Sequence, residues 1–493
     1  MTGTGVAAGD QADTGRLTAT LGARTRSIVF GTAEPAVIDG ELELLTIIDL
    51  AHVVMLAERK LLPVRDAAEL LRHVTRLREN RFKELHHRPM PRGLYMMYET
   101  HLVSVLGPEA GGKLHTGRSR NDIKATTAAI RLREGLAELL SQTLRLQAVL
   151  LCRARAYNDV VMPVYTHFQP AMPVTYGYYL AGVATALGRD IGALRHTLAE
   201  LDRCPLGAGA VSGTDLPIDP ARTAELLGFA APAAHAMDAV ASRDTALRAV
   251  AGAAGVGLTL SRLATDLQLW STQEFGFVEF PERLVGGSSA MPQKRNAFLL
   301  EHVKGRAGAA IGAWTGAASS MKSTPFTNSI EVGTEAVSDV WDALSGTVES
   351  VLLAQVLVSG GRPVPERMAA RAEEGFVTAT VVANRLVRQG MPFRTAHHLV
   401  GAAVRRAVES GSTRLSDADL PAGGVPSLDE VTAEHRYGGG PGVFDASFDA
   451  ERRTLVDHAG WLLGRRESWA VARRKLDEAV VELLAGTDGS GRP

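Results

Sequence analysis

Apolar residues recur every three to four positions along most of this chain, which is the period of an α-helix. One such stripe near the start comprises Leu44, Ile47, Ile48, Ala51, Val54 and Met55, and Pro63 is expected to end that helix. Other long patterns cover 132–150, 175–201, 239–272, 297–321 and 337–358. Alternating, strand-like runs are scarce. The pattern therefore predicts a mainly α fold built on several long helices.

The predicted helix 297–321 is unusual because Gly and Ala crowd its middle. A glycine costs about 1 kcal/mol relative to alanine in a helix interior. Such a helix is favourable where small residues let several neighbours approach closely. The middle of the chain is therefore predicted to be a tightly packed bundle of long helices. Each long helix is apolar over more than one stripe, which favours burial by other subunits as well.

Two loops rich in glycine and proline, 107–112 and 360–365, indicate domain edges. The sequence predicts an N-terminal helical domain (1–112), a central long-helix domain (113–361) and a C-terminal domain of smaller helices (362–493). Composition predicts disorder in 1–15.

Composition narrows the functional classes. The chain has 53 Lys and Arg against 54 Asp and Glu, so no basic surplus indicates a nucleic-acid partner. The N-terminus does not read as a signal peptide, and the most apolar stretch, 249–261, is shorter than the roughly 20 residues of a membrane span. Two cysteines exclude a disulfide framework. A cytoplasmic protein without membrane contact is expected.

The strongest chemical signal is the segment 287–296, which reads Gly-Ser-Ser-Ala-Met-Pro-Gln-Lys-Arg-Asn just before a predicted helix. Glycine supplies a hinge, and a lysine near a helix N-terminus favours negative charge nearby. This fits a serine acting as a base, or a bound carboxylate. By chemistry alone, a flexible linker with a solvated lysine is the stronger interpretation.

The same segment resembles the signature of the fumarase/aspartase superfamily, in which Gly-Ser-Ser, Met-Pro, Lys and Asn occupy fixed positions. Every fixed position is filled here. The resemblance implies that Ser288 is the catalytic base and that Lys294 is also catalytic. It assigns Met291 and Asn296 to substrate binding.

The segment 113–122, Lys-Leu-His-Thr-Gly-Arg-Ser-Arg-Asn-Asp, offers many hydrogen-bond donors in a short turn. It reads either as a basic surface loop or as a clamp for an anion. It is similar to the loop of argininosuccinate lyases that grips substrate carboxylates. The resemblance assigns Ser119, Arg120 and Asn121 to substrate binding, and we call these three residues the clamp.

Thr166 and His167 lie in the run Tyr-Thr-His-Phe-Gln-Pro, and a helix bounded by Pro170 is expected to follow. A lone histidine in a helical protein is usually structural. This one resembles the family's Thr-His element, which implies that Thr166 binds a carboxylate and that His167 is the acid on the amine side. Glu301 matches the acidic residue that pairs with this histidine, a contact that fixes its tautomer and raises its basicity.

Further matches extend the resemblance over about residues 47–448. The run Gly207-Ala208-Gly209 lies between predicted helices without the preceding strand of a dinucleotide loop, so no cofactor is expected. The adjacent pairs His86-His87 and His397-His398 point about 100 degrees apart on a helix, which argues against a metal site.

The chain departs from the argininosuccinate lyase pattern at three places. Aligned on Glu99, an Asp and a His of the family become Gly93 and Tyr95. An early Gly-Ser is absent from the stretch 47–51, Ile-Ile-Asp-Leu-Ala. A Tyr, a Gln and a Lys that contact substrate in the family align with Asn328, Gly333 and Ala336, of which Asn328 remains a candidate for substrate binding.

The resemblance thus keeps the parts that handle a succinyl group and changes those that handle the rest of the substrate. It implies a carbon–nitrogen lyase that converts an N-substituted aspartate to fumarate and an amine by a reversible anti elimination. Argininosuccinate lyase itself, elimination of another group from a substituted succinate, and an inactive crystallin-like homologue remain alternatives. The small or neutral replacements, beside Glu331 and Glu335, indicate a roomier pocket for a cationic or polyamine-like group.

The family builds each site from loops of three subunits. The resemblance therefore implies a three-domain fumarase/aspartase-type fold, a homotetramer with a twenty-helix core, and composite sites for a small dicarboxylate.

Overall fold

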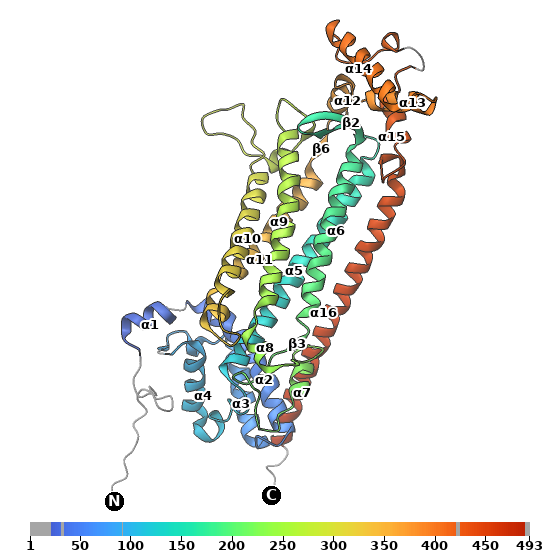
Figure 1. Ribbon diagram of the computed structural model, residues 1–493. Coiled ribbons are helices and arrows are strands. Elements are labelled where there is room, and N and C mark those ends of the chain that lie inside the picture. The colour runs from blue at the N-terminus through green and yellow to red at the C-terminus, as the bar shows by residue number, and fades with distance from the viewer. Residues whose placement is uncertain (1–20, 31–33, 91, 421–423, 489–493) are drawn as a thin grey trace, which may run out of the picture.

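The computed structural model describes residues 21–30, 34–90, 92–420 and 424–488. The disorder predicted for 1–15 falls outside these residues. Within them the chain is mainly α-helical, as predicted, and the molecule is elongated, with short helices at both ends of a long bundle (Figure 1).

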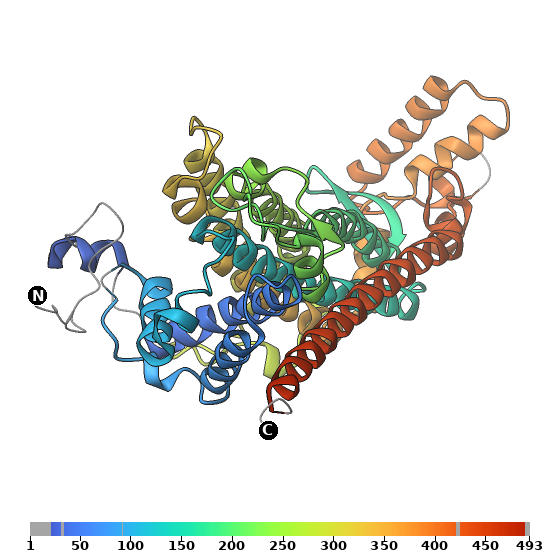
Figure 2. The same cartoon turned by 90° about the horizontal axis from the view of Figure 1, so that it is seen from below.

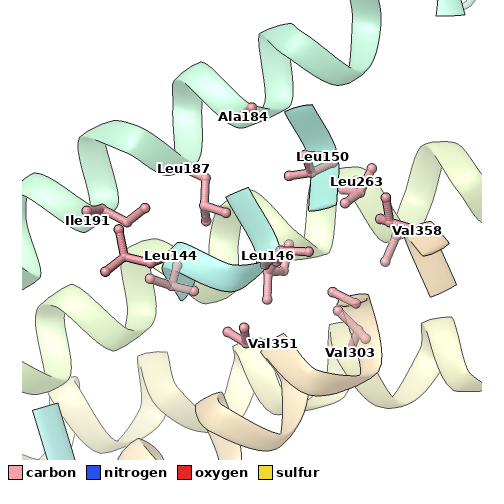
Figure 3. Packing of buried hydrophobic residues seen from close by; sticks show 14 of the residues in the cluster. Leu144, Leu146, Leu150, Ala184, Leu187, Ile191, Leu263, Val303, Val351 and Val358 are labelled. Atoms are coloured by element: carbon pink, nitrogen blue, oxygen red, sulfur yellow. The ribbon is translucent and has the colours of Figure 1, made fainter. Parts of the chain in front are cut away.

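Long helices that run along the molecule form the bundle: α5 (Arg120–Ala156), α6 (Tyr176–Glu200), α9 (Asp244–Trp270), α10 (Leu299–Met321) and α11 (Val340–Gly360). They coincide with the long periodic stretches of the sequence to within a few residues, except that α5 begins well before 132. The stretch predicted over 239–272 divides into the short α8 (Ala236–Ala241) and α9. Leucine, isoleucine, valine and alanine side chains from each bundle helix meet in the core (Figure 3).

One end of the bundle carries the start of α5 and therefore the clamp; we call it the clamp end. Packed there are α2 (Pro35–Glu58), α3 (Val64–Glu79), α4 (Leu94–Gly111) and α7 (Pro220–Leu226), with α1 (Ala23–Phe30) beside them (Figure 1). Buried side chains of these helices form a second apolar core. The helix predicted around 44–55 is α2, and it ends before Pro63.

The opposite end, which we call the loop end, carries α12 (Pro365–Glu374), α13 (Ala379–Arg388), α14 (Phe393–Glu409) and α15 (Leu428–Glu434). Single helical turns complete the chain at η1 (Lys83–Leu85), η2 (Glu282–Leu284), η3 (Glu331–Glu335), η4 (Asp417–Asp419) and η5 (Pro441–Val443).

A hairpin at the loop end corrects the sequence prediction. The strands β1 (Val161–Thr166) and β2 (Gln169–Thr175) pair antiparallel, and α6 begins only at Tyr176. The helix expected next to Pro170 is absent here because Pro163, Pro170 and Pro173 interrupt a helical hydrogen-bond ladder while the valines favour extended backbone. Two shorter pairings join β3 (Arg203–Cys204) to β4 (Ala231–Pro232) and β5 (Val278–Glu279) to β6 (Arg362–Pro363).

The last helix, α16 (Phe444–Asp488), is 45 residues long and returns from the loop end to the clamp end (Figure 2). It packs against α3, α5, α6 and α7. The prediction of smaller helices throughout 362–493 is therefore wrong for α16. This helix buries Leu462, Leu476 and Val480 in the two apolar cores. The ion pairs Arg155–Asp445, Arg195–Asp457 and Arg465–Asp202 also join it to the bundle. The domain boundaries themselves stay a prediction.

One face of α10 is open. Ile311 and Trp314 are about two-fifths exposed, at 38% and 42%. A Cβ placed on any of four glycines of this helix would meet nothing within 4 Å: Gly305, Gly308, Gly312 and Gly316. The helix buries its opposite, alanine-rich face against α9 and α11.

One helical stretch among the described residues, 331–360, is long and apolar enough to cross a membrane by length and composition. It comprises η3 and α11, and α11 packs against α5, α9 and α10 inside the bundle. This is the position of a core helix.

Candidate active site

The clamp lies at the N-terminus of α5. Ser119 caps the helix: its Oγ accepts from Asn121 N at 3.3 Å, and its own N–H donates to Asp122 Oδ1 at 2.9 Å. The other oxygen of Asp122 accepts from Gly207 N at 3.0 Å and from Gly209 N at 2.9 Å. The clamp is thereby fixed to the Gly-Ala-Gly loop.

That loop requires glycine at position 209. Gly209 has a φ of 61°, and a Cβ there would lie 2.5 Å from the carbonyl oxygen of Gly213. The loop also accepts a hydrogen bond from the clamp, since Asn121 Nδ2 donates to Ala210 O at 3.0 Å.

A position that departs from the family pattern touches the clamp directly. Asn328 Nδ2 donates to Asn121 Oδ1 at 3.1 Å, although 207 residues separate them. Gly333 lies close by, and a Cβ on it would be 3.8 Å from Asn328 Oδ1. Ala336, by contrast, is 4% exposed and belongs to the packed interior. Two of the three late departures are thus next to the clamp.

An early departure also lies next to the clamp. Asp49 forms an ion pair with Arg118 at 2.6 Å, and both side chains are 0% exposed. Burial alone would lower the pKa of Arg118, but the Asp49 carboxylate, together with Tyr95 and Tyr98, outweighs burial and holds that pKa above its ordinary value. Arg118 immediately precedes Ser119, so this buried pair fixes the backbone that enters the clamp.

Tyr95, another position that departs from the family pattern, belongs to the same buried cluster. Its hydroxyl is 2.7 Å from His115 Nδ1. Burial raises the pKa of Tyr95, so the hydroxyl stays protonated and donates. Burial, and then Arg118 and Arg120, lower the pKa of His115 to about 4, so its imidazole is neutral at pH 7 and accepts through Nδ1.

At the loop end, Thr166 and His167 lie at the tip of the β1–β2 hairpin. Thr166 pairs with Gln169, so His167 and Phe168 form a two-residue turn, and both have positive φ, 51° and 60°. Residues other than glycine adopt this conformation at a cost of about 1–3 kcal/mol. His167 is exposed, and the side-chain hydrogen bonds of Ser288 and Glu301 within the described residues go to other partners.

The Ser288 loop connects α9 to α10 at the same end. A two-way backbone bridge closes its neck, with Gly286 N donating to Asn296 O at 2.8 Å and Asn296 N donating to Gly286 O at 2.7 Å. Within the loop, Ser288 Oγ accepts from Ala290 N at 3.3 Å and Met291 N at 3.1 Å. Two amide donors aimed at one oxygen stabilise negative charge on it. Met291 and Lys294 are exposed on this loop.

Glu301 lies on the first turn of α10. Its Oε1 accepts from Gln268 Nε2 at 3.0 Å, and Gln268 Oε1 accepts from Lys304 Nζ at 2.5 Å. Gln268 therefore orients the carboxylate of Glu301 and links it to a cation. Sequence reasoning missed Gln268 because it lies 33 residues away on α9 without any local motif.

Arg243, which the sequence analysis did not name as a candidate, lies beside Gly333 at the clamp end. It also lines a cavity of about 250 Å³ with residues that include His235, Asp238 and Trp341. Among the described residues no cluster of His, Cys, Asp or Glu could hold a metal ion.

The predicted site residues fall into two groups at opposite ends of the bundle. Ser119, Arg120, Asn121 and Asn328 lie at the clamp end, while Thr166, His167, the Ser288 loop and Glu301 lie at the loop end (Figure 1). The helix α5 spans the distance between them, and its 37 residues correspond to roughly 55 Å. One chain therefore does not bring the two groups together.

The chain is similar to known lyases. A family model described as "Lyase" matches residues 83–312, and one described as "Argininosuccinate lyase C-terminal" matches residues 376–430. An argininosuccinate lyase of Thermus thermophilus is 42% identical over 345 residues, which are 69% of this chain and 72% of that protein. One of Halorhodospira halophila is 38% identical over 361 residues, 73% of this chain and 77% of that protein.

Solved structures agree at the level of the fold. EDDS lyase in complex with formate is 29% identical and has a TM-score of 0.82, with 92% of this chain and 94% of that chain covered. A class II fumarase from Schistosoma mansoni, 16% identical, has a TM-score of 0.64 over 76% of this chain and 87% of that chain. The chain therefore belongs to the argininosuccinate lyase branch of the fumarase/aspartase superfamily and is a fumarate-releasing carbon–nitrogen lyase.

Proposed function

We propose that this enzyme cleaves an N-substituted aspartate to fumarate and an amine other than arginine, reversibly and without a cofactor. The observation that carries the proposal is the hydrogen bond from Asn328 to Asn121. It joins a position that departs from the argininosuccinate lyase pattern to the clamp, which keeps that pattern. The succinyl half of the substrate thus meets familiar residues, and the amine half meets different ones.

In the elimination, a base removes a proton from the carbon next to a carboxylate, and the electron pair first moves onto that carboxylate. It then returns to form the double bond of fumarate as the carbon–nitrogen bond breaks. Ser288 is the proposed base. Its hydroxyl is a very weak base unless cations and donors surround it. The Ala290 and Met291 amides supply two donors, and Lys294 supplies a cation on the same loop.

The intermediate is a doubly negative aci-carboxylate, and preorganised charge is usually the largest contribution to stabilising such a species. Lys294 and Asn296 act on one carboxylate, with Met291 covering the substrate on the same loop. Thr166 and the clamp residues Ser119, Arg120 and Asn121 hold the carboxylates in place.

The leaving nitrogen must gain a proton. His167 is the proposed acid, directly or through water, and Glu301 of another subunit is its proposed partner. Glu301 is already oriented by Gln268, so it can fix the imidazole tautomer when the two subunits meet.

The separation of the two groups supports composite sites, as in a homotetramer. A clamp and a Ser288 loop roughly 55 Å apart in one chain can share a substrate only when they come from different chains. The open face of α10, lined by glycines, offers the close approach that a shared helical core needs.

Cleavage of argininosuccinate tests the choice of amine. A site for arginine needs partners for a carboxylate and a guanidinium, and losing about 3 kcal/mol of transition-state binding lowers kcat/KM roughly 150-fold. We expect little fumarate from argininosuccinate, measured by ultraviolet absorbance, and N-substituted aspartates from fumarate with other amines. A kcat/KM of ~10⁴ M⁻¹s⁻¹ or more for argininosuccinate would restore arginine as the amine.

A further inference from the structure

Arg243 lies at the clamp end, where α9 begins, and is 7% exposed. Its Nη1 donates to the carbonyl oxygens of Val240 at 3.3 Å and Ser242 at 2.6 Å. Its Nε is buried without a partner, and Nη2 makes no hydrogen bond with any described residue. One edge of the guanidinium thus holds the backbone, and the other edge is available to a ligand.

The free Nη2 faces Gly333. A Cβ on Gly333 would lie 3.9 Å from Arg243 Nη2 and 3.8 Å from Asn328 Oδ1. The glutamine that argininosuccinate lyases carry at this position would fill the space, whereas glycine leaves it open. Asn328 uses Nδ2 to reach Asn121, so its Oδ1 remains an acceptor beside the same space.

The charge around this space is positive. Burial lowers the pKa of Arg243, and no carboxylate among the described residues offsets that effect. Burial also lowers the pKa of Lys124, and repulsion from Arg120 adds to this effect; Glu41 opposes it, and Arg243 makes the smallest contribution, which again lowers the pKa. Three cations thus lie near one another at this end of the site.

The two acidic residues from which the sequence analysis expected a cationic amine do not offset this positive charge. Glu331 and Glu335 are exposed, and neither forms an ion pair within the described part of the chain with Arg120, Lys124 or Arg243. The electrostatics beside Gly333 therefore favour an anionic group on the amine, because an unpaired buried guanidinium gains most from a carboxylate.

We infer that the amine carries its own carboxylate, which binds Arg243 Nη2 in the space left by Gly333 while Asn328 Oδ1 accepts from the leaving nitrogen. The substrate class is an N-(carboxyalkyl)aspartate, formed in the reverse direction from fumarate and an amino acid. The inference rests on the proposed function, because it names the amine of the same site.

Matched amines test it in the direction of addition. Purified enzyme with fumarate is given glycine, β-alanine or 4-aminobutanoate, and in parallel the alkylamine and the diamine of equal length. Product is measured by mass spectrometry. A charge-assisted hydrogen bond predicts that the best amino acid exceeds its matched alkylamine about 10- to 100-fold in kcat/KM.

An alkylamine or diamine that reacts as fast as its matched amino acid overturns the inference and leaves the proposed function standing. If no amine adds to fumarate and no N-substituted aspartate is cleaved, the proposed function itself fails.

Two variants assign the preference to this space. Gly333→Gln fills it and should bring the ratio of amino acid to alkylamine close to one, while Thr334→Gln, an exposed neighbour, should keep the wild-type ratio. Arg243→Gln should likewise remove the preference, with circular dichroism to verify the fold, since Nη1 also holds the start of α9. A ratio that survives Gly333→Gln overturns the assignment to Arg243 whether or not the Arg243 variant folds.

Discussion

The backbone after Ser288 turns so that the amides of Ala290 and Met291 both donate to the Ser288 hydroxyl oxygen. These donors lower the cost of negative charge on that oxygen, which a serine needs before it can accept a proton from carbon. Ser289, its neighbour in the sequence, is exposed and receives no such pair of bonds among the described residues.

We expect Ser288→Ala to reduce turnover by roughly a thousandfold, the scale of removing a positioned base, while the fold and assembly remain. Fumarate release under saturating substrate measures this. Ser289→Ala is the matched control and should retain most activity. If instead Ser289→Ala loses activity and Ser288→Ala retains it, Ser289 is the base.

A second residue-scale prediction concerns Asp49, whose carboxylate faces Arg118 in a fully buried site. Asp49→Asn leaves the guanidinium buried without its counter-charge, which commonly costs about 3–5 kcal/mol. We expect a lower midpoint of urea unfolding and weaker binding of substrate, because Arg118 leads directly into the clamp.

The double variant Asp49→Asn, Arg118→Met separates charge from shape. Removing both charges should recover much of the lost stability, as seen in the urea midpoint. If the double variant loses as much stability as the two single variants added together, the two charges are not coupled.

At the scale of elements, α3 and α4 meet through a pair of buried histidines. His73 Nε2 lies 3.0 Å from His101 Nε2, and Arg76 Nη2 donates to His73 Nδ1 at 3.0 Å. His73 must therefore donate from Nε2 to a neutral His101. Burial, helped by Arg88, lowers the pKa of His101 to about 4, and burial also lowers the pKa of His73.

Stability of the clamp end should fall on acidification. A histidine with a lowered pKa binds fewer protons folded than unfolded, so stability is unaffected above the ordinary pKa near 6.5 and is lost as the pH falls from there toward 4. Charging the pair should cost about 1–3 kcal/mol, and thermal melts across this range measure it.

The variant His73→Gln, His101→Gln is the comparison, because His52 and His115 also have lowered pKa values and contribute to the same slope. The difference between the two pH profiles reports the pair. Parallel profiles would contradict this origin of the acid sensitivity.

The long helices were predictable because burial on a stripe leaves a 3.6-residue period in the sequence. The hairpin was not, because its valines and tyrosine also read as a short buried helix and only the prolines decide between the two. The helix α16 was not predicted either, because its few buried apolar residues, such as Leu462 and Leu476, are widely spaced among charged residues.

For the candidate site, the sequence predicts motifs and not their arrangement in space. The residues of the clamp and the Ser288 loop could be named from their order along the chain. Their separation could not, because it follows from the direction of α5 in the fold. The contacts of Asn328 with Asn121 and of Gln268 with Glu301 join residues far apart in the sequence, so no local pattern announces them.

At the scale of the whole molecule, the proposed composite site predicts complementation. His167→Ala and Ser288→Ala chains should each be inactive alone, because the first removes the proposed acid from every site and the second removes the proposed base. Mixed and allowed to exchange subunits, they should regenerate some intact sites and recover measurable fumarate release. Mass spectrometry verifies the exchange of subunits. If activity does not recover after verified exchange, the result contradicts a shared site.

The length of α5 also implies a lower limit on the protein concentration at which the enzyme is active. If each site needs several chains, then below the dissociation constant of the assembly most chains hold pieces of sites and no whole one. Specific activity should then decline with dilution, and it should do so more steeply than the loss of a single partner would give. Substrate that bridges two chains would oppose the decline, because by mass action a ligand favours the species that binds it. Catalysis and assembly would in this way share one equilibrium, and the protein concentration in an assay would become a variable of the rate law.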